Sequence, residues 1–246
     1  DGIYKAPTTR KKNISPEKAL DLVRLSLDED FSFTKNIQNK NEIFRSSSER
    51  MPEIPDKKID LVVTSPPYLN NFDFAEMTRM HLYFWEMASN WGQITDNVRS
   101  TQIVNTTTSL KGQRELQAHY KQSLPVSVQN KVSKIFSELM EIKKTKKGKK
   151  DYDLLLYPYL AQMKNVLSET YRVLKHNGTF HMMVSDAAFY GVHVSCPQWL
   201  AEIMSDVGFT NVKCIKIRDR GHRWKLDKRE GSKIGLGEYY VFGEKK

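Results

Sequence analysis

Apolar residues are arranged along this chain in two ways, as short continuous runs and as positions that recur every three or four residues. Continuous runs are typical of buried strands, and they predict strands at residues 58–64 and 179–184. The recurring pattern is typical of amphipathic helices. It predicts helices at residues 15–29, 74–89, 128–142 and 157–175 and from Pro197 to Gly208.

Shorter patterns complete the predicted element order. Residues 42–44 favour a short strand, and residues 211–218 and 237–243 favour the last two strands, the final one antiparallel. Asn177-Gly178 is expected to close the preceding helix in a left-handed cap. Strands that alternate with helices predict an α/β fold, here the second half of a doubly wound sheet.

Charge is the compositional feature that changes this picture. The chain has 246 residues and a formal net charge of +10. Residues 141–150 hold six lysines against one glutamate, and residues 216–233 hold eight basic against three acidic residues, so these two segments carry the whole excess. Concentrated positive charge favours a polyanionic partner, most often nucleic acid.

Other compositional features exclude some classes of protein. Cys196 and Cys214 form no CxxC pair, so neither a disulfide framework nor a zinc site is expected. No apolar run approaches the roughly 20 residues that span a bilayer, and no signal peptide is visible. We therefore expect no metal, no membrane partner and a cytoplasmic location.

The pentapeptide Thr64-Ser65-Pro66-Pro67-Tyr68 follows the first predicted strand directly. Open α/β sheets bind ligands at the carboxyl ends of their strands. Proline has a fixed φ and no N–H, so this corner is stiff and rich in hydrogen-bond acceptors. Such a corner can hold an amino group without offering it a proton. The alternative, an exposed polyproline ligand, does not suit a segment that follows a continuous apolar run.

The corner resembles the catalytic motif of the DNA amino-methyltransferases, (Ser/Asp/Asn)-Pro-Pro-(Tyr/Phe/Trp), and residues 69–74 resemble the sequence that follows it in Ser-Pro-Pro-Tyr enzymes. The helix end at 172–179 and the last two strands also resemble the Class I, Rossmann-like methyltransferase sheet. The resemblance covers about residues 42–246. It implies that Ser65, Pro66, Pro67 and Tyr68 are catalytic, that the cofactor is S-adenosyl-L-methionine, and that DNA is methylated on an exocyclic amine.

The resemblance also implies finer assignments. A serine at the corner favours N4 of cytosine over N6 of adenine. Residues expected to contact the cofactor are Ser46, Thr64 and Ser65. Residues expected to contact the base or DNA are Asp186, Arg218, Arg220, Arg223, Trp224 and Lys225, because arginine binds phosphate in a fork and an aromatic ring stacks on a base.

One part of the family pattern is missing. The family holds its cofactor on a glycine-rich loop after the first strand, but the only G-x-G here is Gly235-Leu236-Gly237, which precedes the last predicted strand. We therefore expect a second chain or an upstream segment to supply the loop. The predicted domains are an N-terminal arm and helix (1–41), a catalytic domain (42–89 and 152–246) and a largely helical insertion (90–151) that serves as a possible target-recognition element.

Two other functions remain open at this point. Similar corners with Asn or Asp occur in RNA and tRNA base methyltransferases. A non-catalytic nucleic-acid-binding subunit could also keep this fold without a cofactor loop. A cytosine-C5 methylase is excluded, because it needs a Pro-Cys nucleophile and the order here is Cys196-Pro197.

Overall fold

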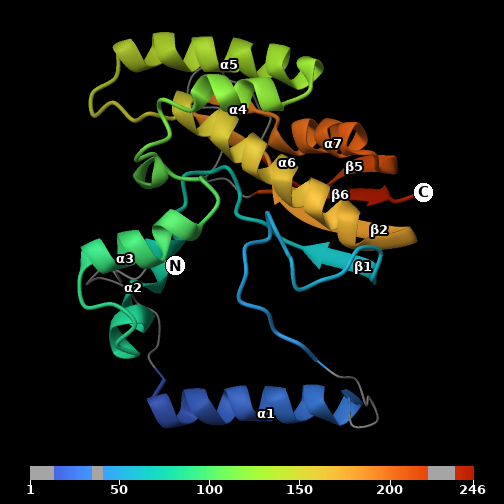
Figure 1. Ribbon diagram of the computed structural model, residues 1–246. Coiled ribbons are helices and arrows are strands. Elements are labelled where there is room, and N and C mark those ends of the chain that lie inside the picture. The colour runs from blue at the N-terminus through green and yellow to red at the C-terminus, as the bar shows by residue number, and fades with distance from the viewer. Residues whose placement is uncertain (1–13, 35–40, 221–235) are drawn as a thin grey trace. The chain divides into compact units, whose positions relative to one another are not determined.

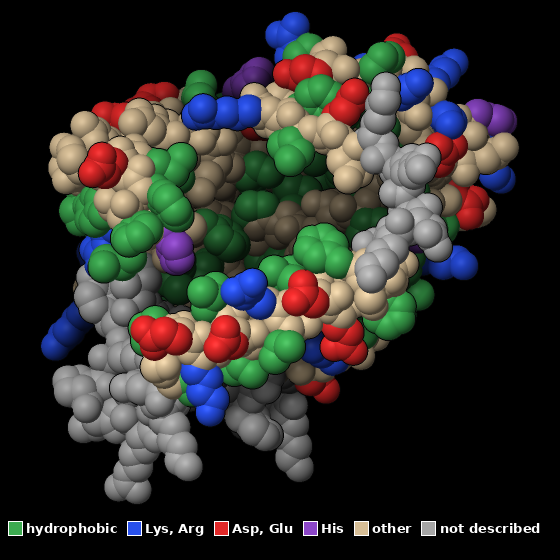
Figure 2. Space-filling model, turned by 90° about the horizontal axis from the view of Figure 1, so that it is seen from below, with side chains coloured by type: hydrophobic (Ala, Val, Ile, Leu, Met, Phe, Trp, Pro, Cys, Tyr) green, Lys and Arg blue, Asp and Glu red, His purple; other side chains and the backbone are tan. Residues whose placement is uncertain are grey.

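The computed structural model describes residues 14–34, 41–220 and 236–246, and the chain divides into two compact units, residues 1–45 and 46–246. In the first unit the helix α1 (Pro16–Thr34) begins after Ser15, whose Oγ accepts a hydrogen bond from the backbone N–H of Lys18 at 3.2 Å. This is the expected N-cap with proline at the first helical position. Figure 2 shows hydrophobic side chains of this helix at the surface among charged ones.

The second unit is built on a four-stranded sheet in the order β1-β2-β6-β5 (Figure 1). β1 (Ile59–Thr64) is parallel to β2 (Leu174–Ser185), and β6 (Gly237–Glu244) lies antiparallel between β2 and β5 (Thr210–Asp219). The last strand thus returns against the others, as predicted. The α/β class and the Rossmann-like arrangement are confirmed for this part of the fold.

Helices cover one face of this sheet. α6 (Leu156–Val173) and α7 (Cys196–Val207) pack against Phe180, Met182 and Val184 of β2, which are buried in the main core (Figure 1). On the opposite face of β1, the side chain of Val63 is 72% exposed. Further exposed aliphatic side chains on strands β1 and β5 are Leu61, Ile215 and Ile217.

The segment between β1 and α6 is mostly helical. Its elements are α2 (Phe74–Phe84), α3 (Trp91–Asn97), the 3₁₀ turns η1 (Arg99–Thr101), η2 (Thr107–Ser109) and η3 (Asp153–Leu155), α4 (Gln117–Ser123) and α5 (Val126–Lys144). Val128, Val132 and Leu139 attach α5 to the core of the sheet. Among the described residues no helix is long and apolar enough to cross a membrane.

Three local predictions were wrong. Residues 42–44 form no strand, and the helix predicted to reach residue 89 ends at Phe84, because Glu86 turns the backbone to φ 54°. Asn177 does have a positive φ of 64°, but it lies inside β2 and does not cap a helix. The carbonyls of Arg172 and Val173 instead accept hydrogen bonds from Lys57 and Lys58, so the segment leading into β1 ends the helix.

A hairpin that the sequence did not predict follows β2. Its strands β3 (Ala187–Phe189) and β4 (Val192–Val194) are joined by Tyr190 and Gly191, which have φ of 53° and 88°. Positive φ at both positions is the geometry of a tight two-residue turn. Because each strand has only three residues, its alternation is too short to recognise in the sequence.

Charged side chains on α6 fix the segment that enters β1. Glu169 accepts a hydrogen bond from the Met51 backbone N–H at 2.6 Å, and Arg172 donates to the carbonyls of Met51 and Ile54 at 2.9 and 3.0 Å. Arg172 also bonds both carboxylate oxygens of Glu169 and one of Asp56. These hydrogen bonds, led by those from Arg172, lower the pKa of Glu169 to about 2.

We predict that this cluster makes stability depend on pH below neutrality. Since the folded-state pKa of Glu169 is lower than its usual value, its stabilisation is complete above about pH 4.5 and is lost as pH falls towards 2. Allowing for solvent screening, Glu169→Gln should cost about 1 kcal/mol at pH 7 and nothing near pH 2. Urea unfolding at both pH values measures this difference. Glu141→Gln, which removes an exposed ion pair to Lys144, is the control, and an equal pH dependence in both variants would contradict the prediction.

Candidate active site

The Ser-Pro-Pro-Tyr corner lies at the carboxyl end of β1, as predicted. Thr64, the last residue of β1, is paired with Met182, so the parallel strand β2 ends at Ser185 on the same edge of the sheet. Ser65 is exposed, Pro66 is buried and Tyr68 is half-buried. The corner therefore presents its hydroxyl to the surface while its prolines anchor it.

Some carbonyl groups of the corner accept hydrogen bonds from the described part of the protein, and one does not. The buried Tyr159 hydroxyl of α6 donates to the Pro67 carbonyl at 2.9 Å. The Tyr68 carbonyl accepts from the backbone N–H of Asn70 at 2.8 Å and from Asn105 Nδ2 at 3.4 Å. Within the described residues no donor is recorded for the Pro66 carbonyl or for Ser65. These two groups, from adjacent residues, are thus an acceptor pair that the described residues leave without a donor; Ser65 is exposed, whereas Pro66 is buried.

Arg220 is brought to the corner from the end of β5. Its guanidinium carbon lies 5.9 Å from the centre of the Tyr68 ring, and its Nη1 donates to Ser185 Oγ at 2.9 Å. Its backbone N–H donates to the Leu236 carbonyl at 2.7 Å, which closes the end of the β5–β6 pair. Arginine over a tyrosine ring is a cation–π arrangement. The arginine therefore connects the carboxyl ends of β1 and β2.

The other predicted DNA-binding residues lie in different settings. Arg218 pairs with Glu238 at 2.5 Å, and its side chain remains largely exposed. The hydrogen bond from Arg218 to Glu238 raises the pKa of the arginine. Arg223, Trp224 and Lys225 lie outside the described residues. Of this set, Arg220 has recorded contacts with the corner.

Asp186 has an internal role, which corrects the expectation that it faces the substrate. The residue is 2% exposed. Its carboxylate accepts hydrogen bonds from the backbone N–H of Gly237 at 2.8 Å and pairs with His193 Nε2 at 2.9 Å. Tyr239 also approaches it, at 3.5 Å. Through these hydrogen bonds the buried carboxylate holds the β3–β4 hairpin and the start of β6 against the end of β2.

The residues expected to contact the cofactor are not brought together. Thr64 and Ser65 lie at the strand end, whereas Ser46 lies in an irregular exposed segment with no recorded contact to the corner. Gly237 of the G-x-G lies at the start of β6, where a Cβ would meet the flexible end of the Lys216 side chain and the ring of Tyr239. Within the described residues no glycine-rich turn follows a strand, so these residues do not form a cradle for S-adenosyl-L-methionine.

Polar residues after the corner form a network that the sequence analysis missed. Asn71, at φ 60°, accepts a hydrogen bond from the Thr107 backbone N–H at 2.9 Å. Asp73 caps α2 through the N–H of Glu76, pairs with Arg99 at 2.9 Å and accepts from Thr108 at 2.8 Å. The available signal was the density of Asn, Asp and Thr at 70–73 and 105–108 in a chain that otherwise forms helices there. The network fixes residues 104–109 against the corner.

Comparisons with known proteins agree with the resemblance seen in the sequence. No protein-family model matches the chain. The chain is similar to the Type II methyltransferase M.AvaI from Nostoc sp. and to the protein of the same name from Anabaena variabilis. In both cases the identity is 25% over 174 residues, or 70% of this chain and 35% of the relative. The chain thus spans about a third of the length of these relatives, and its resemblance to the DNA methyltransferase family is confirmed.

Solved structures give a weaker likeness. A putative DNA modification methylase from Thermus thermophilus matches 78% of this chain and 48% of its own, with 15% identity and a TM-score of 0.33. The same protein complexed with S-adenosyl-L-methionine matches 35% of this chain and 37% of its own, with 19% identity and a TM-score of 0.30. Such TM-scores say nothing about the positions of individual residues.

We predict that the Tyr159 hydroxyl is needed to hold the corner. Burial raises the pKa of Tyr159 far above its usual value, so the group remains a protonated donor to the Pro67 carbonyl. Tyr159→Phe should lower the free energy of unfolding by about 1–2 kcal/mol, since it leaves that carbonyl without its donor. Urea unfolding measures the loss. Tyr157→Phe, which removes a hydroxyl bonded to Ser133 on α5, is the control for helix packing.

In the same variant, the ring of Tyr68 should become more mobile, because the backbone before it loses its anchor. Quenching of tyrosine fluorescence, with a Tyr68→Phe background to assign the signal, reports this change. Unchanged stability and unchanged quenching in Tyr159→Phe would show that the corner is fixed by its prolines alone.

Proposed function

We propose that this chain is the catalytic part of an S-adenosyl-L-methionine-dependent DNA methyltransferase that modifies an exocyclic base amine, N4 of cytosine. The observation that carries the proposal is the available acceptor pair, Ser65 Oγ and the Pro66 carbonyl, at the carboxyl end of β1. The names of the relatives support the same class of reaction. The proposal covers this chain as one part of a larger enzyme.

The acceptor pair suits an aromatic amine. The lone pair of such an amine is conjugated with the ring, which makes the nitrogen a poor nucleophile. If the two N–H bonds donate to Ser65 and Pro66, the nitrogen is held near tetrahedral geometry and its lone pair points away from the corner. Catalysis of this kind is mainly orientation and electrostatics. The corner therefore binds and orients the nucleophile, and the proton that the nitrogen loses on methylation passes to solvent at the exposed Ser65.

Tyr68 and Arg220 suit the rest of the substrate. A half-buried tyrosine ring beside the acceptor pair offers a surface on which a base can stack. Reaching that ring from duplex DNA requires the base to be flipped out, at a cost of a few kcal/mol. Arg220, at 5.9 Å from the ring, carries the charge needed to hold the adjacent backbone.

The choice of cytosine over adenine depends on the first corner residue. A carboxylate accepts a stronger hydrogen bond from the amine than a neutral hydroxyl does. Serine provides the weaker acceptor, and the resemblance associates serine corners with N4-cytosine enzymes. Both bases carry the amine beside a ring nitrogen, so the geometry of the corner admits either.

Binding of the methyl donor needs a further stretch of polypeptide, and the sheet indicates where that polypeptide attaches. β1 is the edge strand of the sheet, although it is parallel to its neighbour. Parallel strands are normally covered on both faces, and an open edge is a site for strand addition. Leu61 and Val63 leave one face of β1 apolar and exposed. We propose that a polypeptide carrying the glycine-rich cofactor loop adds a strand beside β1 and covers this face.

We predict N4-methylcytosine as the main product when the complete enzyme acts on DNA. Mass spectrometry of digested DNA distinguishes it from N6-methyladenine. Ser65→Ala and Tyr68→Ala should each reduce the rate at least about a hundredfold, because orientation and electrostatic contacts contribute on that scale. Ser89→Ala and Tyr83→Phe, which alter residues away from the corner, are the matched controls. Full activity of both corner variants would overturn the assignment of the site, and methylation of RNA but not DNA would overturn the substrate.

We also predict that the 246 residues alone bind S-adenosyl-L-methionine weakly or not at all, since the described residues form no cradle for it. Calorimetry with the purified chain measures this, and low-micromolar affinity would contradict it. Extending the chain with the adjoining coding sequence, or adding the product of the neighbouring reading frame, should create binding. Val63→Glu should abolish that gain, whereas Val126→Glu, which alters an equally exposed valine at the start of α5, should leave it unchanged.

A further inference from the structure

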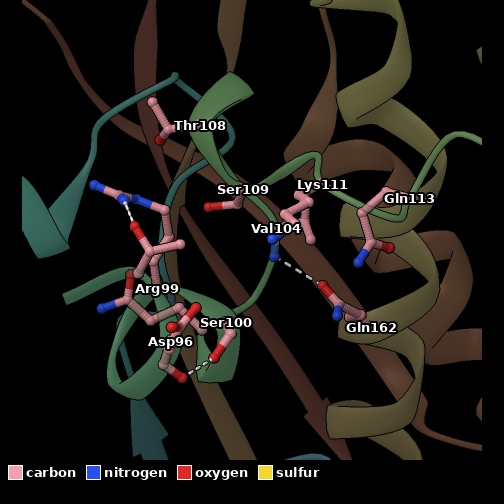
Figure 3. A pocket seen from close by; sticks show the side chains of 11 residues that line it. Asp96, Arg99, Ser100, Val104, Thr108, Ser109, Lys111, Gln113 and Gln162 are labelled. Atoms are coloured by element: carbon pink, nitrogen blue, oxygen red, sulfur yellow. Dashed lines mark hydrogen bonds between the residues drawn. The ribbon is translucent and has the colours of Figure 1, made fainter. Parts of the chain in front are cut away.

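A polar cavity lies beside the segment that fixes the corner. Its volume is about 220 Å³, and it is lined by residues of α3, η1, the segment 102–113 and α6 (Figure 3). A single water occupies about 30 Å³ of liquid, so the cavity has room for a larger group. Its polar lining residues include Arg99, Ser109, Lys111, Gln113 and Gln162.

Two buried polar atoms of this lining have no partner among the described residues, the Nε of Arg99 and the Oγ of Ser109. The Arg99 side chain is 9% exposed, and its other nitrogens are fixed by Thr95 at 2.7 Å and Asp73 at 2.9 Å. Its remaining N–H therefore cannot turn away to find a partner elsewhere. A buried donor left unsatisfied destabilises the fold, so the cavity is suited to an acceptor that reaches this N–H.

Two glutamines add donors from the opposite wall. The Oε1 atom of Gln162 accepts from the Val104 backbone N–H at 2.8 Å, and the Oε1 atom of Gln113 accepts from the Tyr120 hydroxyl at 2.6 Å. Because these bonds use the oxygen of each amide, the NH₂ groups remain as donors. Figure 3 shows Arg99 on one side of the cavity and both glutamines on the other, with Ser109 between them.

The charged side chains at the cavity are Lys111, Asp96 and Arg99. Lys111 and Asp96 are both exposed, and the buried Arg99 is paired with Asp73, so its contribution to the cavity is the Nε–H donor. Asp96 is the only acid among the lining residues. A ligand that satisfies several converging donors must offer several acceptor oxygens, and an oxyanion does so better than a base or an alcohol.

We propose that this cavity is a phosphate-binding subsite that holds a backbone phosphodiester of the DNA strand. The same short segment lines the cavity through Thr108 and Ser109 and contacts the corner through Asn105, which donates to the Tyr68 carbonyl at 3.4 Å and to the Phe72 carbonyl at 2.9 Å. A strand with its flipped base at Tyr68 thus passes close to the cavity. The choice of DNA as the source of the phosphate rests on the proposed function. The inference that the cavity binds an oxyanion rests on its donors alone.

Replacing one donor by an acceptor tests the subsite. Gln162→Glu keeps the oxygen that binds Val104 and replaces the NH₂ donor by a negatively charged oxygen. Gln93→Glu is the matched control, because Gln93 also uses its oxygen to accept from a backbone N–H, that of Ser89, but lies outside the cavity. Both variants change the net charge equally, and thermal unfolding checks that both are folded. Ser109→Ala is a second, neutral variant.

The probe is a single-stranded oligonucleotide in which one phosphate at a time is replaced by an uncharged methylphosphonate, with binding measured by fluorescence anisotropy. In the wild type and in Gln93→Glu, replacing the phosphate at one position should weaken binding of the oligonucleotide about tenfold. Gln162→Glu and Ser109→Ala should bind the unmodified strand more weakly and lose the sensitivity at that position. A flat profile in the wild type, or the same sensitive position in Gln162→Glu, would overturn the proposal.

A second readout identifies the source of the phosphate. The NMR signal of the Arg99 Nε–H should shift when the unmodified oligonucleotide is added. If inorganic phosphate shifts this signal but the methylphosphonate profile is flat, the site binds a free anion and the DNA source is wrong. Neither readout requires methyl transfer. An enzyme that lacks activity but keeps the position-specific profile would therefore refute the proposed function and leave the subsite intact.

Discussion

Two consecutive prolines leave the middle of the corner without backbone donors, and the surrounding structure depends on this constraint. Pro66 and Pro67 cannot donate the hydrogen bonds that normally fix a turn. Besides the local N–H of Asn70, the donors to the corner carbonyls come from distant segments, Tyr159 on α6 and Asn105 in the loop before η2. These contacts determine where α6 and residues 104–109 lie. They also decide which carbonyl is used internally and which remains available to a substrate.

The sequence predicted those parts of the fold that depend on local pattern. The strands β1 and β2 are continuous apolar runs, and the α6 and α7 helices have clear periods, so their residues alone indicate them. The corner was predictable for a similar reason, because its five residues are contiguous. Its position at a strand end follows from the apolar run before it, and the structure agrees.

The parts that the sequence did not predict depend on contacts between residues far apart in the chain. Arg99 meets Asp73 across 26 residues, and Asn105 meets Phe72 across 33. No hydrophobic periodicity or sequence motif indicates that such distant residues form a pair. Asp186 was misjudged for the same reason: its place at a strand end suggested a ligand, but His193 and Gly237, which occupy it, come from two later elements.

The proposed function separates the binding of the base, at the corner, from the supply of the methyl group. The contacts that shape the corner come from α6, residues 104–109 and Arg220, all within the second unit. The exposed edge of β1 and its open apolar face lie on the other side of the strand from the buried core. Burial of apolar surface stabilises by about 25 cal/mol per Å². Under the proposed function, burial of this face would therefore favour docking of the cofactor-binding segment without any change at the corner. Such a separation favours binding at a preorganised site. The groups of the corner are already ordered before the cofactor-binding segment docks, so no further ordering entropy is lost at that step.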